Sequence, residues 1–291
     1  MRYGLLALAL LTVTLGGCSE GVLNPKGPIA AGERLILFNS LGIMLAIVVP
    51  TILATLAVAF WFRASNRRAE YLPDFEYSGR LELLVWSIPA MTVLLVGGVA
   101  WVGAHDFDPR KAIASTVKPV TVQAVSLDWK WLFIYPEQGI ASVNHLTVPV
   151  GTPISLELTS ATVMNSFFVP QLAGQIYTMS GMVTRLQLQA DHAGSYPGFS
   201  AMFSGDGFSD MRFTVDAVDN ADFTQWVGKA RDAGAVLDTR SYADLAKPSK
   251  AVAPFTYRAV ATDLFSGIAN TASTADDPFQ PICSTSQRAE R

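Results

Sequence analysis

Few side chains in this sequence could carry out chemistry by themselves. Among its 291 residues the chain has two cysteines, Cys18 and Cys283, which are too few for a disulfide framework or a thiolate metal cluster. Its three histidines, His105, His145 and His192, are not spaced as a pair of metal ligands, so we expect surface or interfacial positions for them. The cysteines and histidines therefore indicate no metal site of their own, and we single out no catalytic residue in this chain.

The composition favours a membrane protein. Charged residues make up 15% of the chain, hydrophobic residues 50%, and the mean hydropathy is +0.31. An ordinary soluble domain carries about 25% charged residues, so a cytosolic enzyme of this length would be more polar. The net charge of -3 also argues against a polycation that binds nucleic acid.

Cys18 stands at the end of a segment that is typical of an export signal. Arg2 is followed by an apolar run over residues 5–15, and small residues precede the cysteine in Leu15-Gly16-Gly17-Cys18. This ending resembles the bacterial lipobox. The resemblance implies that residues 1–17 are a lipoprotein signal peptide and that Cys18 carries a lipid such as palmitate. An ordinary buried cysteine behind an uncleaved anchor is the alternative.

Two nearly uncharged stretches are long enough to cross a bilayer. We predict transmembrane helices over residues 35–62 and 82–103, because a span needs about 20 apolar residues; buried core helices are the less favoured alternative. The connecting loop, residues 63–81, holds four arginines, at positions 63, 67, 68 and 80. Basic residues concentrate in cytoplasmic loops, so segment 18–34 and everything after residue 103 are predicted to lie outside the cytoplasm.

Beyond residue 103 the hydrophobic pattern changes from helical to alternating. Four runs, which begin at Val120, Ile154, Leu186 and Met211, place apolar and polar side chains on opposite faces, as half-buried antiparallel strands do. Turn residues separate the runs, so we predict a β-sandwich over residues 104–218. Met211 begins the last run and is expected in its core.

A helical, aromatic-rich extension is predicted over residues 219–268. Phe223, Trp226, Val227 and Ala230 recur at helical spacing, and Gly234 is placed to end that helix. One or two further short helices are indicated by Tyr242, Leu245, Tyr257, Leu264, Phe265 and Ile268. Residues 269–291 are rich in Ser, Thr, Ala, Asp and Pro, which predicts a disordered tail.

Three segments resemble a known family. Residues 163–170 (VMNSFFVP) and 198–211 (GFSAMFSGDGFSDM) resemble the copper loops of haem–copper oxidase subunit II, and residues 126–136 (SLDWKWLFIYP) resemble its aromatic segment. The resemblance covers the chain outside the tail. It implies an α+β membrane protein: a two-helix transmembrane hairpin, then a cupredoxin-like antiparallel β-sandwich and a short helical C-terminal extension.

Departures from the family's copper ligands indicate the branch. In cytochrome c oxidases a binuclear copper centre takes two cysteines, two histidines, a methionine and a backbone carbonyl. Here the histidine positions hold Asn165 and Phe208, the cysteine positions Ser200 and Ser204, and the carbonyl position Met202, while Met211 keeps a ligand type. Because soft thiolates select copper at such a site, we predict no metal in this chain. In its lack of these ligands the chain resembles the quinol oxidase branch of the family.

That resemblance implies a role without a redox centre in this chain. A membrane quinol, ubiquinol or menaquinol, would give electrons to haem in subunit I, which also holds a copper ion. Oxygen would be reduced to water there and protons pumped, with no cytochrome c involved. This chain would support subunit I and cap its outer face in the bacterial inner membrane, its C-terminal domain periplasmic, beside subunits III and IV. Candidate contacts to other subunits are Asp128, Trp129, Trp131, Tyr135 and Arg185.

Two other hypotheses remain open on the sequence. One is a membrane lipoprotein whose degenerate cupredoxin domain acts as a protein-binding or assembly module. The two spans argue against it, because a lipid alone would tether such a protein. The other is a cytochrome c oxidase subunit whose copper site has moved elsewhere in the chain. For Trp131 and Phe133, burial in the sandwich is the favoured alternative to an interface.

Overall fold

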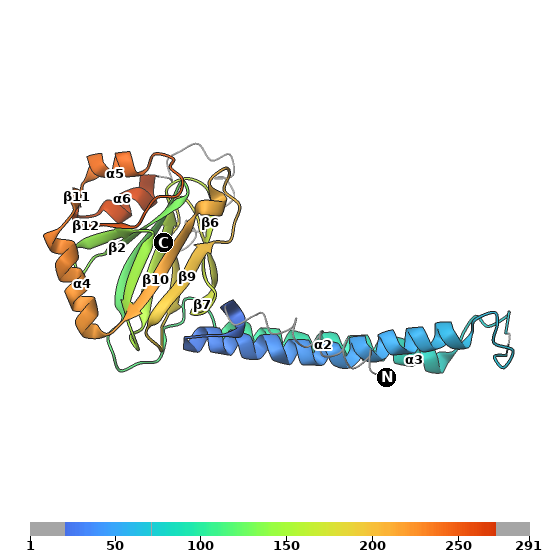
Figure 1. The fold of residues 1–291 in the computed structure, drawn as a ribbon. Coiled ribbons are helices and arrows are strands. Elements are labelled where there is room, and N and C mark those ends of the chain that lie inside the picture. Colours follow the sequence, from blue (N-terminus) through green and yellow to red (C-terminus); the bar gives the residue numbers. More distant parts are fainter. Residues whose placement is uncertain (1–20, 71, 272–291) are drawn as a thin grey trace, which may run out of the picture. The chain divides into compact units, whose positions relative to one another are not determined.

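The structure is a computed structural model that describes residues 21–70 and 72–271 (Figure 1). The predicted signal peptide, Cys18 and Cys283 lie outside the described residues. Two compact units are present: one comprises residues 32–108, and the other joins the chain up to Ala31 with the chain from Pro109 onward. A short 3-10 helix, η1 (Gly21–Leu23), begins the described part of the second unit.

The first unit holds two long helices, α2 (Pro28–Trp61) and α3 (Gly79–Asp106). Both are long and apolar enough to cross a membrane. Each extends beyond its predicted span, because a helix continues through flanking polar residues after the apolar stretch has ended. Pro50 and Pro89 lie inside the helices, and the nearby Thr51 donates its hydroxyl to the carbonyl of Ile47 (2.8 Å).

The second unit is built on two packed β-sheets. The seven-stranded sheet has the order β11-β12-β3-β2-β1-β5-β8, and the five-stranded sheet has the order β4-β10-β9-β6-β7. The strands are β1 (Val120–Leu127), β2 (Lys130–Tyr135), β3 (Ile140–Val143), β4 (His145–Pro149), β5 (Ile154–Ser160), β6 (Asn165–Val169), β7 (Ala173–Thr178), β8 (Thr184–Leu188), β9 (Gly194–Ser200), β10 (Arg212–Val218), β11 (Ala235–Leu237) and β12 (Phe255–Val260). The predicted sandwich is confirmed, and the four alternating runs are β1, β5, β8 and β10.

The sheets are mixed, whereas the prediction was purely antiparallel. β1 pairs in parallel with β5, β4 with β10, and β11 with β12. After β1 the chain forms β2 and β3 of the same sheet and then crosses to β4 of the other sheet. It comes back as β5, which lies beside β1 and runs in the same direction. Alternating hydrophobicity reports which face of a strand is buried, and it does not report strand direction.

The core between the sheets is aromatic. Phe167 stacks on Phe213 with ring centroids 4.9 Å apart, and Trp131 meets both rings edge-on at 5.3 and 5.7 Å. A side chain at Gly198 would begin 2.2 Å from the Phe213 ring, so only glycine leaves room for it. Trp131, Phe133 and Met211 are fully buried, which confirms their predicted place in the core.

The C-terminal extension combines helices with two added strands. After α4 (Asn220–Asp232) come α5 (Thr239–Leu245) and α6 (Leu264–Thr271), which lie near β11 and β12 (Figure 1). The predicted face of α4 is buried at Phe223, Val227 and Ala230. Tyr257 was expected in a helix but lies on β12, because this segment pairs with β3 on one side and with β11 on the other. The predicted tail began at residue 269, yet α6 continues to Thr271 because Ala269 packs inward.

Candidate functional site

The positions that correspond to copper ligands gather at one end of the sandwich. Asn165 begins β6, Ser200 ends β9, and the loop from there to β10 carries Met202, Ser204 and Phe208 before Met211. The pairing of β6 with β9 places Phe167 opposite Ser200, and the Ala201 amide donates to the Ser166 carbonyl (2.9 Å). Sheet register therefore brings the two predicted loops together.

A buried hydrogen-bond network includes two of these positions, Asn165 and Ser200. The Ser200 hydroxyl donates to Asn165 Oδ1 (3.0 Å), and Asn165 Nδ2 donates to the Val163 carbonyl (3.1 Å) and to Ser126 Oγ (3.5 Å). Ser126 Oγ in turn lies 3.1 Å from Thr178 Oγ1. All four polar side chains are buried. Because these groups satisfy one another, the network is complete without a ligand.

The remaining positions offer little to a metal. The Met211 thioether is fully buried and accepts a weak contact from Ser204 Oγ at 4.0 Å. The Phe208 ring packs edge-on against Phe203 (5.6 Å), and the Met202 carbonyl accepts from Ser200 Oγ (3.3 Å). Among residues 21–70 and 72–271, no group of three or more His, Cys, Asp or Glu side chains could hold a metal ion. Hydroxyl, amide and phenyl groups with one thioether do not fit a binuclear copper centre.

Trp129 holds in place the loop between β9 and β10, which resembles one of the family's copper loops. Its backbone is in the left-handed region (φ 64°), and its indole N–H donates to the Ser204 carbonyl (3.0 Å). A side chain at Gly207 would begin 2.3 Å from the indole ring, so the loop passes close over the ring face. Lys250 Nζ lies 5.5 Å from the ring centroid. These contacts fix the path of the loop.

Two of the predicted subunit contacts are wrong. Trp131 and Tyr135 are both fully buried, so their side chains are not available to another subunit. The Tyr135 hydroxyl donates to the Thr147 carbonyl (3.0 Å), and burial raises the pKa of this phenol well above its usual value. All six residues of β2 are buried, because the seven-stranded sheet is covered by the other sheet on one face and by the C-terminal extension on the other.

The other three predicted contacts lie at or near the surface. Trp129 is partly buried, and Asp128 accepts a hydrogen bond from the Thr162 hydroxyl (2.7 Å). Arg185 is exposed and pairs with Glu157 across β5 and β8 (3.5 Å). Their role as subunit contacts remains a prediction.

The three histidines have separate surroundings. His145 Nε2 lies 2.6 Å from Asp216 Oδ2 and is partly buried beside Trp226. His105 Nδ1 lies 2.9 Å from the Trp101 carbonyl, and His192 is exposed. The exposed or partly exposed side chains fit the surface positions that were predicted, and an interfacial role for any of them remains a prediction.

Sequence reasoning missed Lys130, which is 1% exposed. Its ammonium donates to the Lys247 carbonyl (2.8 Å), Ser249 Oγ (2.7 Å) and the Asp128 carbonyl (3.4 Å). Burial lowers the pKa of this amine, and nearby Asp128 opposes that effect. Lys130 thereby clamps the extension to the hairpin of β1 and β2. The sequence feature that could have indicated its burial is its position between two tryptophans, Trp129 and Trp131.

Two family descriptions match this chain. Residues 137–218 match the family described as cytochrome c oxidase subunit II, periplasmic domain, and residues 231–271 match the COX aromatic rich motif. The second match covers β11, β12, α5 and α6, so the extension is part of the family pattern. A solved structure, the periplasmic domain of subunit II of cytochrome oxidase (CoxB) of Bradyrhizobium japonicum, is 24% identical, with a TM-score of 0.38 over 43% of this chain and 97% of that one.

Full-length relatives are more similar. Cytochrome bo(3) ubiquinol oxidase subunit 2 of Pseudomonas aeruginosa is 48% identical over 268 residues, which is 92% of this chain and 80% of that protein. Ubiquinol oxidase subunit 2 of Acetobacter aceti is 46% identical over 251 residues, 86% of this chain and 81% of that protein. Identity of this order over most of both sequences, on a chain with these spans and this sandwich, means that it belongs to the subunit II family of bo-type quinol oxidases and is one subunit of an oxidoreductase complex.

Proposed function

We propose that this chain is the metal-free structural subunit of its quinol oxidase. The observation that carries the proposal is the network of Asn165, Ser200, Ser126 and Thr178, whose polar groups bond to one another where a copper centre would need thiolates and imidazoles. Electrons would then pass from a membrane quinol to haem and copper in subunit I without entering this chain. Reduction of oxygen to water and proton pumping would take place in subunit I.

The same end of the sandwich offers a surface for subunit I. Apolar side chains are exposed around the network: Val163, Met164, Met182, Val183 and Phe203. Phe203 is 75% exposed, and Asp128 lies beside this group through its bond to Thr162. Apolar side chains clustered on one end of a domain are typical of a protein interface. In this proposal the domain contacts subunit I here and caps its outer face.

The two helices and a second anchor would hold the domain at the membrane. The chain is a membrane subunit with a periplasmic domain. We propose in addition that both helices span the inner membrane, that the arginine-rich loop is cytoplasmic, and that Cys18 is lipidated. Subunits III and IV would complete the complex. Tethering through two spans raises the effective concentration of the domain at its partner, so a modest contact surface is sufficient.

Deletion and complementation test the role in the oxidase. A strain that lacks this subunit should lose quinol-driven oxygen uptake by its membranes, and the intact chain should restore it. Phe203→Asp should lower co-purification of the haem-containing subunit in mild detergent by about tenfold or more, because a charge would be buried in an apolar contact. Val236→Asp, at another exposed apolar residue (40%) that lies on β11, is the control and should have little effect. Unchanged uptake after deletion would refute the oxidase role.

Metal analysis tests the metal-free state separately. The purified full-length chain should contain far less than one copper per molecule after exposure to Cu(II) and removal of excess metal. Its absorption spectrum should lack thiolate-to-copper charge-transfer bands. Stoichiometric, tightly held copper would contradict the proposal even if the deletion strain behaved as expected.

A further inference from the structure

Three arginines lie close together just beyond the end of α2, in residues 63–68, the arginine turn. Arg63 follows the last helical residue, Trp61, by two positions, and Arg67 and Arg68 come within the next five residues. All three arginines are exposed. None of them has an ion-pair partner in the part of the chain that the structure describes. Their positive charges are therefore available to an anion from outside the chain.

Asn66 folds the arginine turn against the end of the helix. Its side-chain amide donates to the Trp61 carbonyl (2.6 Å), and its backbone amide donates to the Arg63 carbonyl (2.9 Å). Its side-chain oxygen accepts from the backbone amide of Arg68 (3.1 Å). A helix end leaves carbonyl groups without partners, and Asn66 satisfies one of them. The arginines are therefore held beside the final turn of α2.

The acidic residues of the same loop stand apart from the arginine turn. Residues 63–68 contain no acidic residue, whereas Glu70, Asp74 and Glu76 follow before the next basic residue, Arg80. Within the described residues no ion pair joins the two halves of the loop. The turn therefore keeps a positive field that attracts anions.

Aromatic rings next to the turn indicate its depth in the membrane. Phe60, Trp61 and Phe62 end the apolar stretch of α2, and all three are exposed. Such rings are typical of the level at which lipid headgroups begin. The Arg63 Cζ atom lies 4.1 Å from the centroid of the Phe60 ring, so this guanidinium stays at the same level. Phosphate groups are the anions at that depth, and guanidinium binds phosphate through paired N–H donors.

We propose that Arg63, Arg67 and Arg68 bind the phosphate of an anionic phospholipid in the adjoining leaflet, which is the cytoplasmic leaflet in the proposed orientation. The site rests on the proposed function in one respect, that both helices span the membrane. A zwitterionic phospholipid fits less well, because the arginine turn offers no acidic side chain to its ammonium group. The bound headgroup would hold the end of α2 at a fixed depth.

Fluorescence quenching by brominated lipids tests the proposal through Trp61, which lies beside the arginine turn. The purified full-length chain is reconstituted in phosphatidylcholine vesicles that contain a small fraction of brominated phosphatidylglycerol or of brominated phosphatidylcholine. Bromine quenches a tryptophan that it contacts. The contribution of Trp61 is the difference in quenching between each chain and its Trp61→Phe counterpart. Two exposed lysines of the other unit, Lys118 and Lys229, provide a control that removes the same charge elsewhere.

We expect the parent chain to prefer phosphatidylglycerol over phosphatidylcholine by about tenfold or more in relative association constant. Arg67→Gln combined with Arg68→Gln should lower that preference by about fivefold or more, since two phosphate donors are lost. Arg67→Lys combined with Arg68→Lys keeps the charge but loses the paired donors, so its preference should fall between the two. Lys118→Gln combined with Lys229→Gln should leave the preference unchanged.

Equal quenching by the two lipids, or a preference that survives the double glutamine change, would overturn the proposal. So would an equal loss in the lysine control, because that would mean attraction by net charge alone. If the double glutamine change instead releases another subunit from the purified complex and leaves lipid contact unaltered, the arginine turn binds protein and the proposal fails.

The orientation of the loop is tested separately. In a chain with Cys283→Ser, a cysteine introduced by Ser65→Cys should resist a membrane-impermeant maleimide in spheroplasts. Labelling there would refute the proposed orientation alone, because lipid contact in vesicles does not depend on which side of the membrane the loop faces.

Discussion

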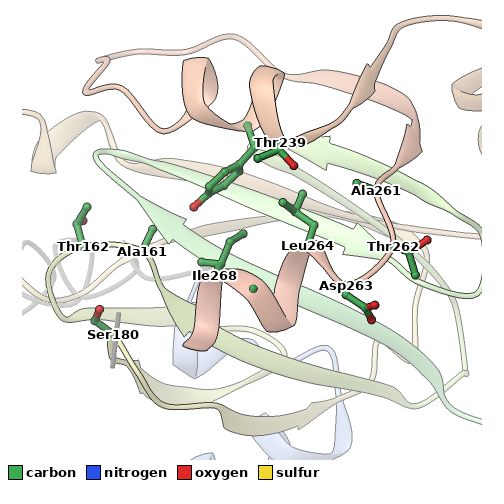
Figure 2. A pocket seen from close by; sticks show the side chains of 11 residues that line it. Ala161, Thr162, Ser180, Thr239, Ala261, Thr262, Asp263, Leu264 and Ile268 are labelled. Carbon is green, nitrogen blue, oxygen red and sulfur yellow. The ribbon is translucent and has the colours of Figure 1, made fainter. Parts of the chain in front are cut away.

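The two faces of the seven-stranded sheet are packed very differently. Its inner face meets the other sheet in a core whose members are almost all fully buried, with aromatic rings of Trp131, Phe167 and Phe213 within 4.9–5.7 Å of one another. Its outer face meets the C-terminal extension, where Phe265 and Ile268 remain 7% and 6% exposed. Cavities of about 620 and 400 Å³ adjoin α6 there, and Figure 2 shows the larger one.

The difference indicates that the sandwich core supplies most of the stability of the domain, whereas the C-terminal extension can be loosened more easily. Close-packed aromatic rings hold the sandwich, since dispersion and apolar burial both favour the filled core. The extension is held by a smaller apolar cluster together with individual polar bonds, such as those of Lys130 to Lys247 and Ser249 and that of the Asn144 amide to the Val252 carbonyl (2.8 Å). Loss of a single bond should therefore loosen the extension before it unfolds the sandwich.

The largest effect on the free energy of unfolding is expected when one aromatic ring is removed from each face in turn. Phe167→Ala should lower the free energy of unfolding by about 3–5 kcal/mol, because a filled core cannot close over the cavity. Phe265→Ala should cost about 3 kcal/mol or less, since its site is already loosely packed. Denaturant titration of the purified chain in mild detergent, followed by tryptophan fluorescence, measures both. Equal losses would show that the two faces are packed alike.

A smaller effect is expected when the lysine clamp is removed. Lys130→Met keeps the apolar stem but removes the donor to the Lys247 carbonyl and Ser249 Oγ, so the variant should lose about 1–3 kcal/mol. Cleavage by added protease should increase within residues 246–253 and not within the sandwich. Ser249→Ala removes one of the acceptors and should show a weaker form of the same change. Cleavage spread evenly over the domain would contradict a local clamp.

The stability of the outer face should depend on alkaline pH through the phenol of Tyr242. Burial raises the pKa of this phenol to about 12. A pKa higher in the folded than in the unfolded chain means full stabilisation below about pH 10 and its loss as the pH rises toward 12. Tyr242→Phe should therefore match the parent at pH 8 and lose less stability between pH 10 and 12. Identical pH profiles for the two chains would contradict the burial of the phenol.

The smallest effect is expected at His145 and Asp216, which join β4 and β10 near the surface. Their side chains lie 2.6 Å apart but are 26% and 35% exposed, so water screens the pair. A double-mutant cycle with His145→Gln and Asp216→Asn should give a coupling energy of about 0.2–1 kcal/mol. A coupling above about 2 kcal/mol would mean that this edge is as well packed as the aromatic core.

Much of the fold could be predicted from local patterns. The two long apolar helices and the strands β1, β5, β8 and β10 follow from apolar length and period, which act over neighbouring residues. The expectation that this chain binds no copper stays a prediction, and it rests on residue types, since Asn165, Ser200, Ser204 and Phe208 carry neither thiolate nor imidazole.

Other features depended on contacts between distant residues. Trp131 and Tyr135 could be placed inside only once the five-stranded sheet and α4 were seen to cover the inner face of β2. The parallel pairing of β1 with β5, the burial of Lys130 and the strand that holds Tyr257 have the same origin. The sequence by itself determined that thiolate and imidazole groups are missing from these positions, because ligand atoms belong to residue types. Only the tertiary structure decided what replaces those groups, because the network of Asn165, Ser200, Ser126 and Thr178 joins strands far apart in the chain.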